Sequence, residues 1–239
     1  MDKHKMYFNW SSGKDSALAL YYLLQDKNYT IDELVTTVNS HFNRVSMHGL
    51  RKELLVAQTE AIQIKSSLIE LPEMPNMETY ENKMTETISR LKNEGFTHSA
   101  FGDIFLEDLK NYRETQLKKQ HLKAVFPLWK RNTKTLLNEF LDLGFKTIIV
   151  CANSKYFDES FVGTVIDQYF IDNLPEGVDP CGENGEFHTF CFDGPIFKTP
   201  ISFSIGEKVY RAYDPPRTDE SVCKSKGEKY GVWYCDLIP

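Results

Sequence analysis

The sequence predicts an α/β fold in which a parallel sheet carries helices on both faces, followed by a small β-rich C-terminal extension. Strand-type and helix-type segments alternate as far as residue 172, a pattern typical of a parallel sheet with crossover helices. Beyond residue 172 the strand-type segments follow one another directly, separated by Gly and Pro turns. We therefore expect two units, at residues 1–172 and 173–239.

The expected strands are short runs rich in β-branched and aromatic residues. They lie at 6–10, 33–39, 67–71, 98–101, 123–128 and 147–151, and in the extension at 186–192, 201–205, 207–213 and 231–237. The run TIIVC at 147–151 is apolar almost throughout, which is typical of a strand covered on both faces.

The expected helices carry apolar residues at the spacing of one helix face. In the segment 14–25, Ala17, Leu20, Tyr21 and Leu24 stand at positions i, i+3, i+4 and i+7. Further helices are predicted at 51–64, 78–94, 107–120, 133–143 and 161–170, and Gly95 is a suitable C-terminal stop for the one before it.

Composition favours a folded protein without a nucleic-acid partner. The 239 residues are 41% hydrophobic, enough for one sizeable core, and the formal net charge of −6 is a poor match for nucleic-acid phosphates. No apolar run approaches the roughly 20 residues that span a membrane, and the first strand begins too early to leave room for a signal peptide. The five cysteines form no C-x-x-C pair, so we expect reduced thiols and a cytoplasmic location.

The loop SSGKDS, residues 11–16, is the first candidate site. It joins a strand to a helix, whose N-terminus presents unpaired N–H groups and a positive dipole end that favour an anion. Gly13 would let a ligand approach the backbone closely. The loop is neither a G-x-x-x-x-G-K-[ST] phosphate loop nor a G-x-G-x-x-G dinucleotide fingerprint. An ordinary Ser/Gly turn with an Asp N-cap is the alternative interpretation.

A second candidate follows from sheet geometry. In parallel sheets, ligands bind beyond the carboxyl ends of the strands, where the strand order reverses. Gly102 and Asp103 end the fourth predicted strand, at the same edge as the loop 11–16. Asp103 would either face a ligand there or cap the helix that starts near Glu107, and the pattern alone supports both roles.

The third candidate is the segment CGENGEFH, residues 181–188. Glu186 and His188, two residues apart on a predicted strand, would share one face and could bind ammonium or accept its proton, with Glu183 close by. Spacing alone fits a hairpin with a solvated polar face equally well. His48, Arg51 and Glu53 are weaker candidates, as is the group listed last: Arg113, Trp129, Lys130 and Arg131.

SSGKDS resembles the S-G-G-x-D-S loop of the N-type ATP pyrophosphatases, with Ser12 in place of the usual second glycine. Four longer blocks are similar to those of the diphthine–ammonia ligase family, in the same order: RVSMHGLRKELLVAQTEAI, FGDIFLEDLKNYRE, FPLWKRNT and DPCGENGEFHTFCFDGPIFK. The resemblance implies a five-stranded adenine nucleotide alpha hydrolase-like (HUP, Rossmann-like) sheet, with an ATP-binding PP-loop domain at 1–172 and a substrate-side extension at 173–239.

The resemblance also implies roles for single residues. The backbone of residues 12–15 would hold the phosphates of ATP, and Lys14 would neutralise their charge. Asp15 would cap the helix or help to bind Mg²⁺, which prefers carboxylate and phosphate oxygens. Further binding or catalytic residues implied in this way are Ser11, Ser12, Gly13, Ser16, Gly102, Asp103, Glu183, Glu186 and His188.

The function that the resemblance implies is an ATP-dependent, amide-forming ligase. It would adenylate a carboxylate, release pyrophosphate and trap the adenylate with free ammonia, because no second domain for a glutaminase is present. The carboxylate would be the diphthine of elongation factor 2 in a host that makes diphthamide. A PP-loop enzyme that modifies tRNA and an ATP-binding regulator without turnover are the alternatives. A homo-oligomer is compatible with all three.

Overall fold

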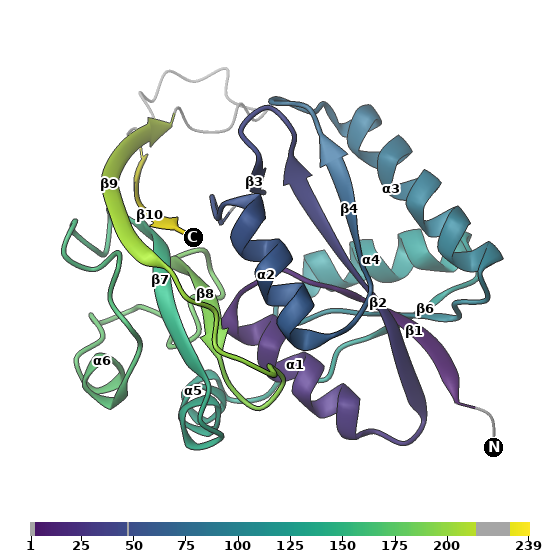
Figure 1. The fold of residues 1–239 in the computed structure, drawn as a ribbon, viewed down its shortest axis with the longest axis horizontal. Helices are drawn as coiled ribbons and strands as arrows, with labels where there is room; N and C mark the ends of the chain where they lie inside the picture. The colour runs from purple at the N-terminus through teal and green to yellow at the C-terminus, as the bar shows by residue number, and fades with distance from the viewer. Residues whose placement is uncertain (1–2, 47, 214–229) are drawn as a thin grey trace.

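The computed structural model describes residues 3–46, 48–213 and 230–239. In chain order the elements are β1 (His4–Asn9), α1 (Lys14–Gln25), β2 (Tyr29–Asn39), β3 (Arg44–Val45), α2 (Lys52–Ile62), β4 (Ser66–Leu71), α3 (Met77–Asn93), β5 (His98–Ala100), α4 (Glu107–Lys119), β6 (Lys123–Val125), α5 (Thr133–Asp142), β7 (Lys146–Asn153), α6 (Gln168–Asp172), β8 (Phe187–Asp193), β9 (Ser204–Tyr213) and β10 (Tyr230–Ile238). Figure 1 shows them gathered around two sheets.

The first sheet confirms the predicted parallel α/β fold. Five parallel strands lie in the order β4-β2-β1-β5-β6, and the short β3 pairs antiparallel with the end of β2. The chain runs outward from β1 through β2 to β4, then returns to the other side of β1 for β5 and β6. The strand order therefore reverses between β1 and β5, where the loops that follow both strands meet.

Helices cover both faces of this sheet, as predicted. Met6 and Phe8 of β1 pack in the cluster that contains α1 and α2, whereas Tyr7 packs with α3 and α4 on the opposite face. The alternation follows from the two-residue period of a strand. The two helical layers lie on either side of the sheet in Figure 1.

The second sheet is antiparallel, in the order β8-β7-β10-β9. It corrects the prediction for the apolar run at 147–151, which lies in β7 and not in the parallel sheet. A strand buried on both faces has the same apolar sequence pattern in a parallel and in an antiparallel sheet, because the pattern indicates burial and does not identify the neighbouring strands. Strands β7–β10, with α5 and α6, form the left half of the molecule in Figure 1 and pack toward α1 and α2.

Two local predictions in this half are wrong. The segment 161–170 is not a helix, and only α6 is helical there. Thr164 accepts a hydrogen bond from the Ile149 N–H, and Val165 bridges to Ile148, so β7 occupies the backbone groups that a helix would need. The segment 201–205 is not a separate strand, since β9 begins at Ser204 and continues, with one register shift against β10, to Tyr213.

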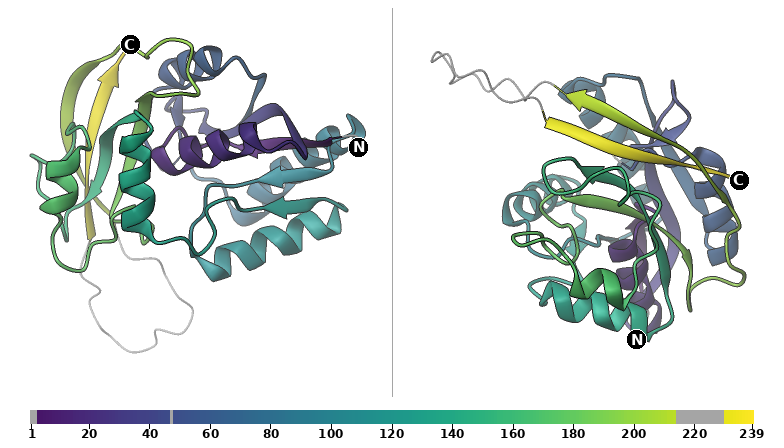
Figure 2. Two further views of the ribbon diagram at one scale, coloured as in Figure 1. Left: turned by 90° about the horizontal axis from the view of Figure 1, so that it is seen from below. Right: turned by 90° about the vertical axis from the view of Figure 1, so that its left-hand side faces the viewer.

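Contacts distant in sequence join the two halves. The Lys198 N–H donates to the Ala61 carbonyl at the end of α2. Near the C-terminus, the Asp236 carboxylate accepts from Arg44, at 2.9 Å, and from Arg51, at 2.6 Å. These ion pairs tie β10 to both ends of the loop that leads from β3 into α2, and the left view of Figure 2 shows the two halves side by side.

Four cysteines are buried free thiols, Cys151, Cys181, Cys191 and Cys235, in agreement with the expected reduced state. Cys223 lies outside the described residues. Of the helices in the described ranges, none is both long and apolar enough to cross a membrane.

Glu33 is the buried charge on which the β2–β4 side of the sheet depends. Its side chain is 1% exposed and lies 2.7 Å from Lys65 Nζ, and it accepts hydrogen bonds from Arg90 and from Ser67. Burial raises the pKa of Glu33, but the hydrogen bonds from Arg90, Lys65 and Ser67 outweigh it and lower the pKa to about 2.

We predict that Glu33→Gln lowers the free energy of unfolding at pH 7 by about 1–3 kcal/mol, because Arg90 and Lys65 lose a charged acceptor. The folded-state pKa lies below the ordinary value of 4.5, so the contribution is complete above pH 4.5 and is lost as the pH falls toward about 2. Urea denaturation of both proteins across this range measures the difference.

The matched control is Glu86→Gln on α3, whose side chain is 77% exposed and which should change the free energy of unfolding by less than about 0.5 kcal/mol. A difference between wild type and Glu33→Gln that stays constant from pH 7 to pH 3 would contradict the assignment.

Candidate active site

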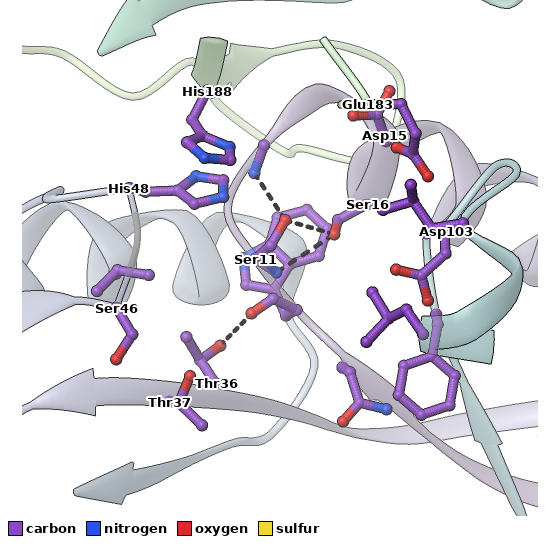
Figure 3. A pocket seen from close by; sticks show the side chains of 18 of the residues that line it. Ser11, Asp15, Ser16, Thr36, Thr37, Ser46, His48, Asp103, Glu183 and His188 are labelled. Atoms are coloured by element: carbon purple, nitrogen blue, oxygen red, sulfur yellow. Dashed lines mark hydrogen bonds between the residues drawn. The ribbon is translucent and has the colours of Figure 1, made fainter. Parts of the chain in front are cut away.

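A cavity of about 730 Å³ opens at the carboxyl edge of the parallel sheet. The loop 11–16 after β1, the loop after β5 and the segment 181–189 before and within β8 line it together (Figure 3). The first two segments lie where the strand order of the parallel sheet reverses, and the third leads into β8 of the antiparallel sheet. The cavity therefore lies where the two halves meet.

Gly13, and not Asp15, is the N-cap of α1, so the interpretation of the loop as a turn with an Asp cap is wrong. The hydroxyl groups of Ser11 and Ser16 lie 2.7 Å apart and close the two ends of the loop on each other. A Cβ at Gly13 would come within 3.1 Å of the His48 ring and 3.3 Å of the Thr189 carbonyl oxygen, so glycine is needed for this close packing.

Ser12 adopts the left-handed conformation, with φ of 70°, that a glycine would adopt without strain. Its carbonyl oxygen accepts from the Gln58 side chain, at 3.0 Å, and from the Cys191 N–H, at 2.9 Å. Gln58 in turn accepts from the indole of Trp10 at 2.7 Å. These bonds hold the unusual backbone in place, and Gln58 is a residue that the sequence analysis missed. The available signal was a glutamine four residues after Leu54, on the apolar face of the predicted helix 51–64, and the structure shows it fully buried.

Lys14 supplies a buried positive charge beside the cavity. Its side chain is 3% exposed, and its ammonium donates to Asp15, at 2.8 Å, and to the Cys181 carbonyl. Burial lowers the pKa of Lys14, but the negative charge of Asp15 and the further groups around it raise it by more, so the net shift is upward. Lys14 thus stays charged at neutral pH.

Asp103 pairs with Arg113 of α4, whose Nε lies 2.9 Å from the carboxylate. The N-cap of α4 is Leu106, so the alternative role of Asp103 as a helix cap is wrong. Burial raises the pKa of Asp103, and Arg113 only partly offsets this. A Cβ at Gly102 would come within 3.0 Å of the Ser16 nitrogen, and this close approach brings the end of β5 against the start of α1.

Glu183 is drawn beside Asp15 in Figure 3, and the Asp15 charge acts on it. Its carboxylate accepts from the Ile104 N–H at 2.7 Å, in the loop after β5. Burial raises the pKa of Glu183 to about 7; the bond from Ile104 lowers it, and the nearby Asp15 charge raises it. A carboxyl group that titrates near neutral pH inside a cavity is suited to proton transfer.

His48 and His188 lie stacked at the cavity wall, with ring centroids 4.8 Å apart and an interplanar angle of 23°. Burial and the neighbouring imidazole lower the pKa of His48 to about 3, and burial with the Lys14 charge lowers that of His188 to about 4. His48 Nδ1 lies 3.2 Å from the Thr189 carbonyl, which can only accept, so Nδ1 carries the hydrogen and Nε2 is left as an acceptor.

The structure does not bring Glu186 to the cavity. Its carboxylate is 1% exposed and accepts from the Asp179 and Asn184 N–H groups, at 3.0 Å and 2.9 Å. The expected common face with His188 is not observed, because the tight turn before β8 needs an acceptor for its own N–H groups. The turn also requires Gly182, at φ of 70°, where a Cβ would come within 2.8 Å of the Phe187 carbonyl oxygen.

The weaker candidates separate into two sets. Arg113 and His48 line the cavity, whereas Arg51 forms the ion pair with Asp236 described above. The remaining members lie outside the cavity lining: Glu53, Trp129, Lys130 and Arg131. Within the described ranges, no three His, Cys, Asp or Glu side chains lie close enough to bind a metal ion by themselves.

The strand order, the loop at its reversal point and the buried Lys14 define the class: an adenine nucleotide alpha hydrolase-like domain of the PP-loop type, joined to an antiparallel sheet. Residues 4–124 match the family model of the diphthamide synthase N-terminal domain, and residues 132–214 match that of the diphthamide synthase C-terminal domain. The chain belongs to the diphthamide synthase family.

Curated relatives carry one name. The chain is 32% identical over 115 residues to the diphthine–ammonia ligase of Homo sapiens, covering 46% of this chain and 43% of that protein. It is 31% identical over 120 residues to that of Mus musculus, covering 48% and 45%. The chain thus spans less than half the length of these relatives. The U34-tRNA thiolase NcsA from Methanococcus maripaludis is similar at a TM-score of 0.39 and 19% identity, over 60% of this chain and 59% of that chain.

The left-handed backbone at Ser12 leads to a stability prediction. Ser12→Gly should keep or raise the free energy of unfolding, by up to about 1 kcal/mol, because a Cβ at this φ costs roughly 1–2 kcal/mol and the flexibility of glycine returns part of that gain. Ser12→Val should lower it by more than 1 kcal/mol, since a β-branched residue is least tolerant of positive φ, on the order of the 1–3 kcal/mol of such strain.

Ser12→Ala is the matched control, since it removes the hydroxyl and keeps the Cβ. Urea denaturation of the three variants ranks them. Finding Ser12→Gly less stable than Ser12→Ala would show that the backbone at Ser12 is not strained.

Proposed function

We propose that this protein is an ATP-dependent, amide-forming ligase that activates a carboxylate as its adenylate, releases pyrophosphate and transfers the acyl group to ammonia. One observation carries the proposal: a single cavity is lined by the loop 11–16 with its buried Lys14, by Glu183 beside Asp15, and by the paired imidazoles of His48 and His188. The membership of the family and the names of the curated relatives support it.

The loop side of the cavity would bind the phosphates. When the substrate carboxylate attacks the α-phosphorus of ATP, the bond to the β-phosphate breaks and negative charge grows on the departing pyrophosphate. The positive end of α1 and the fixed charge of Lys14 are already in place to stabilise it. Because Lys14 is held by Asp15 and Cys181 beforehand, little reorganisation is needed during the reaction.

The residues present suit Mg²⁺ brought in with ATP. Mg²⁺ usually takes one or two protein carboxylates and completes its coordination with phosphate oxygens and water. Asp15, at 29% exposure beside the loop, can supply such a carboxylate, and the described residues hold no three-ligand protein cluster that would suit a tightly bound transition metal. The ion would contribute further neutralisation of phosphate charge.

The part of the cavity lined by Glu183, His48 and His188 would receive ammonia. In this step nitrogen bonds to the acyl carbon, the bond to the AMP oxygen breaks, and one proton leaves the nitrogen. Glu183, with its pKa near 7, is the best-matched acceptor for that proton. His48 and His188 are neutral at this pH, and the free Nε2 of His48 can accept a hydrogen bond from the incoming amine. Glu183 therefore replaces Glu186 and His188 as our choice of base.

The substrate follows from the relatives. A diphthine carboxylate on elongation factor 2, with ammonia as the nitrogen source, is the substrate we propose where the host makes diphthamide, in keeping with the name of the human and mouse proteins.

The products of ATP test the reaction class. We expect AMP and pyrophosphate, and we expect labelled pyrophosphate to exchange into ATP when the carboxylate is present. Asp15→Ala should abolish exchange, because Asp15 holds Lys14 and would supply a carboxylate to the Mg²⁺ that accompanies ATP, while Asp32→Ala, at an exposed carboxylate on β2, should leave it unchanged.

Each result that would contradict the proposal points to a different alternative. Release of ADP alone would contradict adenylation. Binding of ATP without turnover for any tested carboxylate would favour a regulator, and exchange that depends on tRNA would favour a tRNA-modifying enzyme. Full exchange activity in Asp15→Ala would show that the loop does not bind the phosphates.

The role of Glu183 predicts a pH profile. The carboxylate form must accept the proton, so amide formation should rise as the pH increases through about 7. Glu183→Gln should lower amide formation about 10²–10⁴-fold and remove this limb, because an amide accepts no proton. Pyrophosphate exchange should fall far less, since adenylation precedes the proton transfer.

Glu176→Gln, an exposed carboxylate in the same half of the molecule, is the control and should behave as wild type. Loss of exchange and amide formation by the same factor in Glu183→Gln would show that Glu183 acts in ATP binding and not as the base.

A further inference from the structure

The outer edge of β9 is a long unpaired strand edge. β9 spans ten residues and is the last strand in the order of its sheet. Within the described ranges its backbone pairs only with β10, regularly from Lys208 to Tyr213 and with one register shift between Lys208 and Ile205. Exposed strand edges of this length readily pair with another chain, and proteins usually shorten or block them. Figure 2 shows β9 at the periphery of the molecule.

Symmetry limits how two copies could join through this edge. Two identical strands pair antiparallel about a two-fold axis perpendicular to the sheet, so each residue and its symmetry mate lie on the same face. Because faces alternate along a strand, two residues that lie opposite each other must be an even number of positions apart in the sequence. One residue therefore lies directly opposite its own copy in the partner, with the axis midway between them, and this residue defines the register of the pairing.

Only one of these registers matches the charges of β9. With Val209 on the axis, Glu207 of each copy lies opposite Arg211 of the other, twice in the same interface. Axes at Glu207, Lys208 or Arg211 would place a charge directly opposite itself, and an axis at Tyr210 gives no pair of opposite charges. Opposite charges across strands stabilise the pairing and like charges oppose it.

The side chains concerned are available for this contact. Glu207 and Arg211 are exposed, and neither forms a salt bridge with another residue that the structure describes. Ile205 and Tyr210 are large apolar side chains left 54% and 50% exposed on the same strand. Association would remove part of this apolar surface from water.

We propose that two copies of this chain associate through antiparallel pairing of their β9 edges, centred on Val209, with reciprocal Glu207–Arg211 ion pairs. The two four-stranded sheets then form one continuous antiparallel sheet. The occupant of the edge is a second copy, because the charge order of the strand is complementary to itself in this register alone. No residue of β9 lines the cavity, so the interface and the active site are separate.

Charge exchange tests the proposal. Sedimentation velocity of the wild type at tens of micromolar should show a dimer. Glu207→Arg alone places arginine opposite Arg211, and Arg211→Glu alone places glutamate opposite Glu207; each should raise the dissociation constant at least tenfold. The double variant Glu207→Arg/Arg211→Glu should restore the dimer, since each pair again has opposite charges.

A mixture of the two single variants distinguishes a disrupted interface from a folding defect. The two single variants, each weakened alone, should form a heterodimer when mixed in equal amounts, because every cross-strand pair then joins arginine to glutamate. Lys83→Glu on α3, a half-exposed charge away from β9, is the control and should leave the dissociation constant unchanged. A wild type that stays monomeric, single variants that dimerise as tightly as the wild type, or a mixture that forms no heterodimer would each overturn the proposal.

Discussion

The carbonyl oxygen of Ser12 is the point on which the site depends. It accepts from Gln58 of α2 and from the N–H of Cys191 in β8, so one backbone atom joins the loop, the parallel half and the antiparallel half. Both donors are buried, and each would be left unsatisfied if the loop turned over. The left-handed backbone of a non-glycine residue is stable here because two buried donors require it.

The two hydrogen bonds to the Ser12 carbonyl oxygen also determine where the charged groups of the cavity lie. The loop brings the ammonium of Lys14 under the Cys181 carbonyl, and the segment that carries Cys181 also carries Glu183 and His188. Burial, with a smaller contribution from the same positive charge, lowers the pKa of both imidazoles, and burial raises that of Glu183. One cavity thus holds a fixed positive charge, a carboxyl group with a raised pKa and two neutral imidazoles.

Much of the fold was predictable because its signals are local. The loop 11–16, the alternation of strands and helices and the reversal at Gly102 and Asp103 follow from period and spacing, and the structure confirms the sheet that they imply. Strand β7 was assigned to the wrong sheet because an apolar run does not identify its partners. Glu186 was misplaced because the sequence does not reveal that the turn before β8 requires its carboxylate as an internal acceptor.

The residues that sequence reasoning missed act across long separations. Asp236, at the C-terminus, binds Arg44 and Arg51, which flank the loop that carries His48. No pattern near Asp236 indicates this role, since its partners lie more than 180 residues earlier in the chain. Ion pairs of this kind fix the distance between β10 and the cavity wall, and Tyr234 of the same strand packs 3.2 Å from where a Cβ at Gly49 would lie. The position of His48 beside His188 is therefore set jointly by β8, which bears one ring, and by β10, which restrains the loop bearing the other.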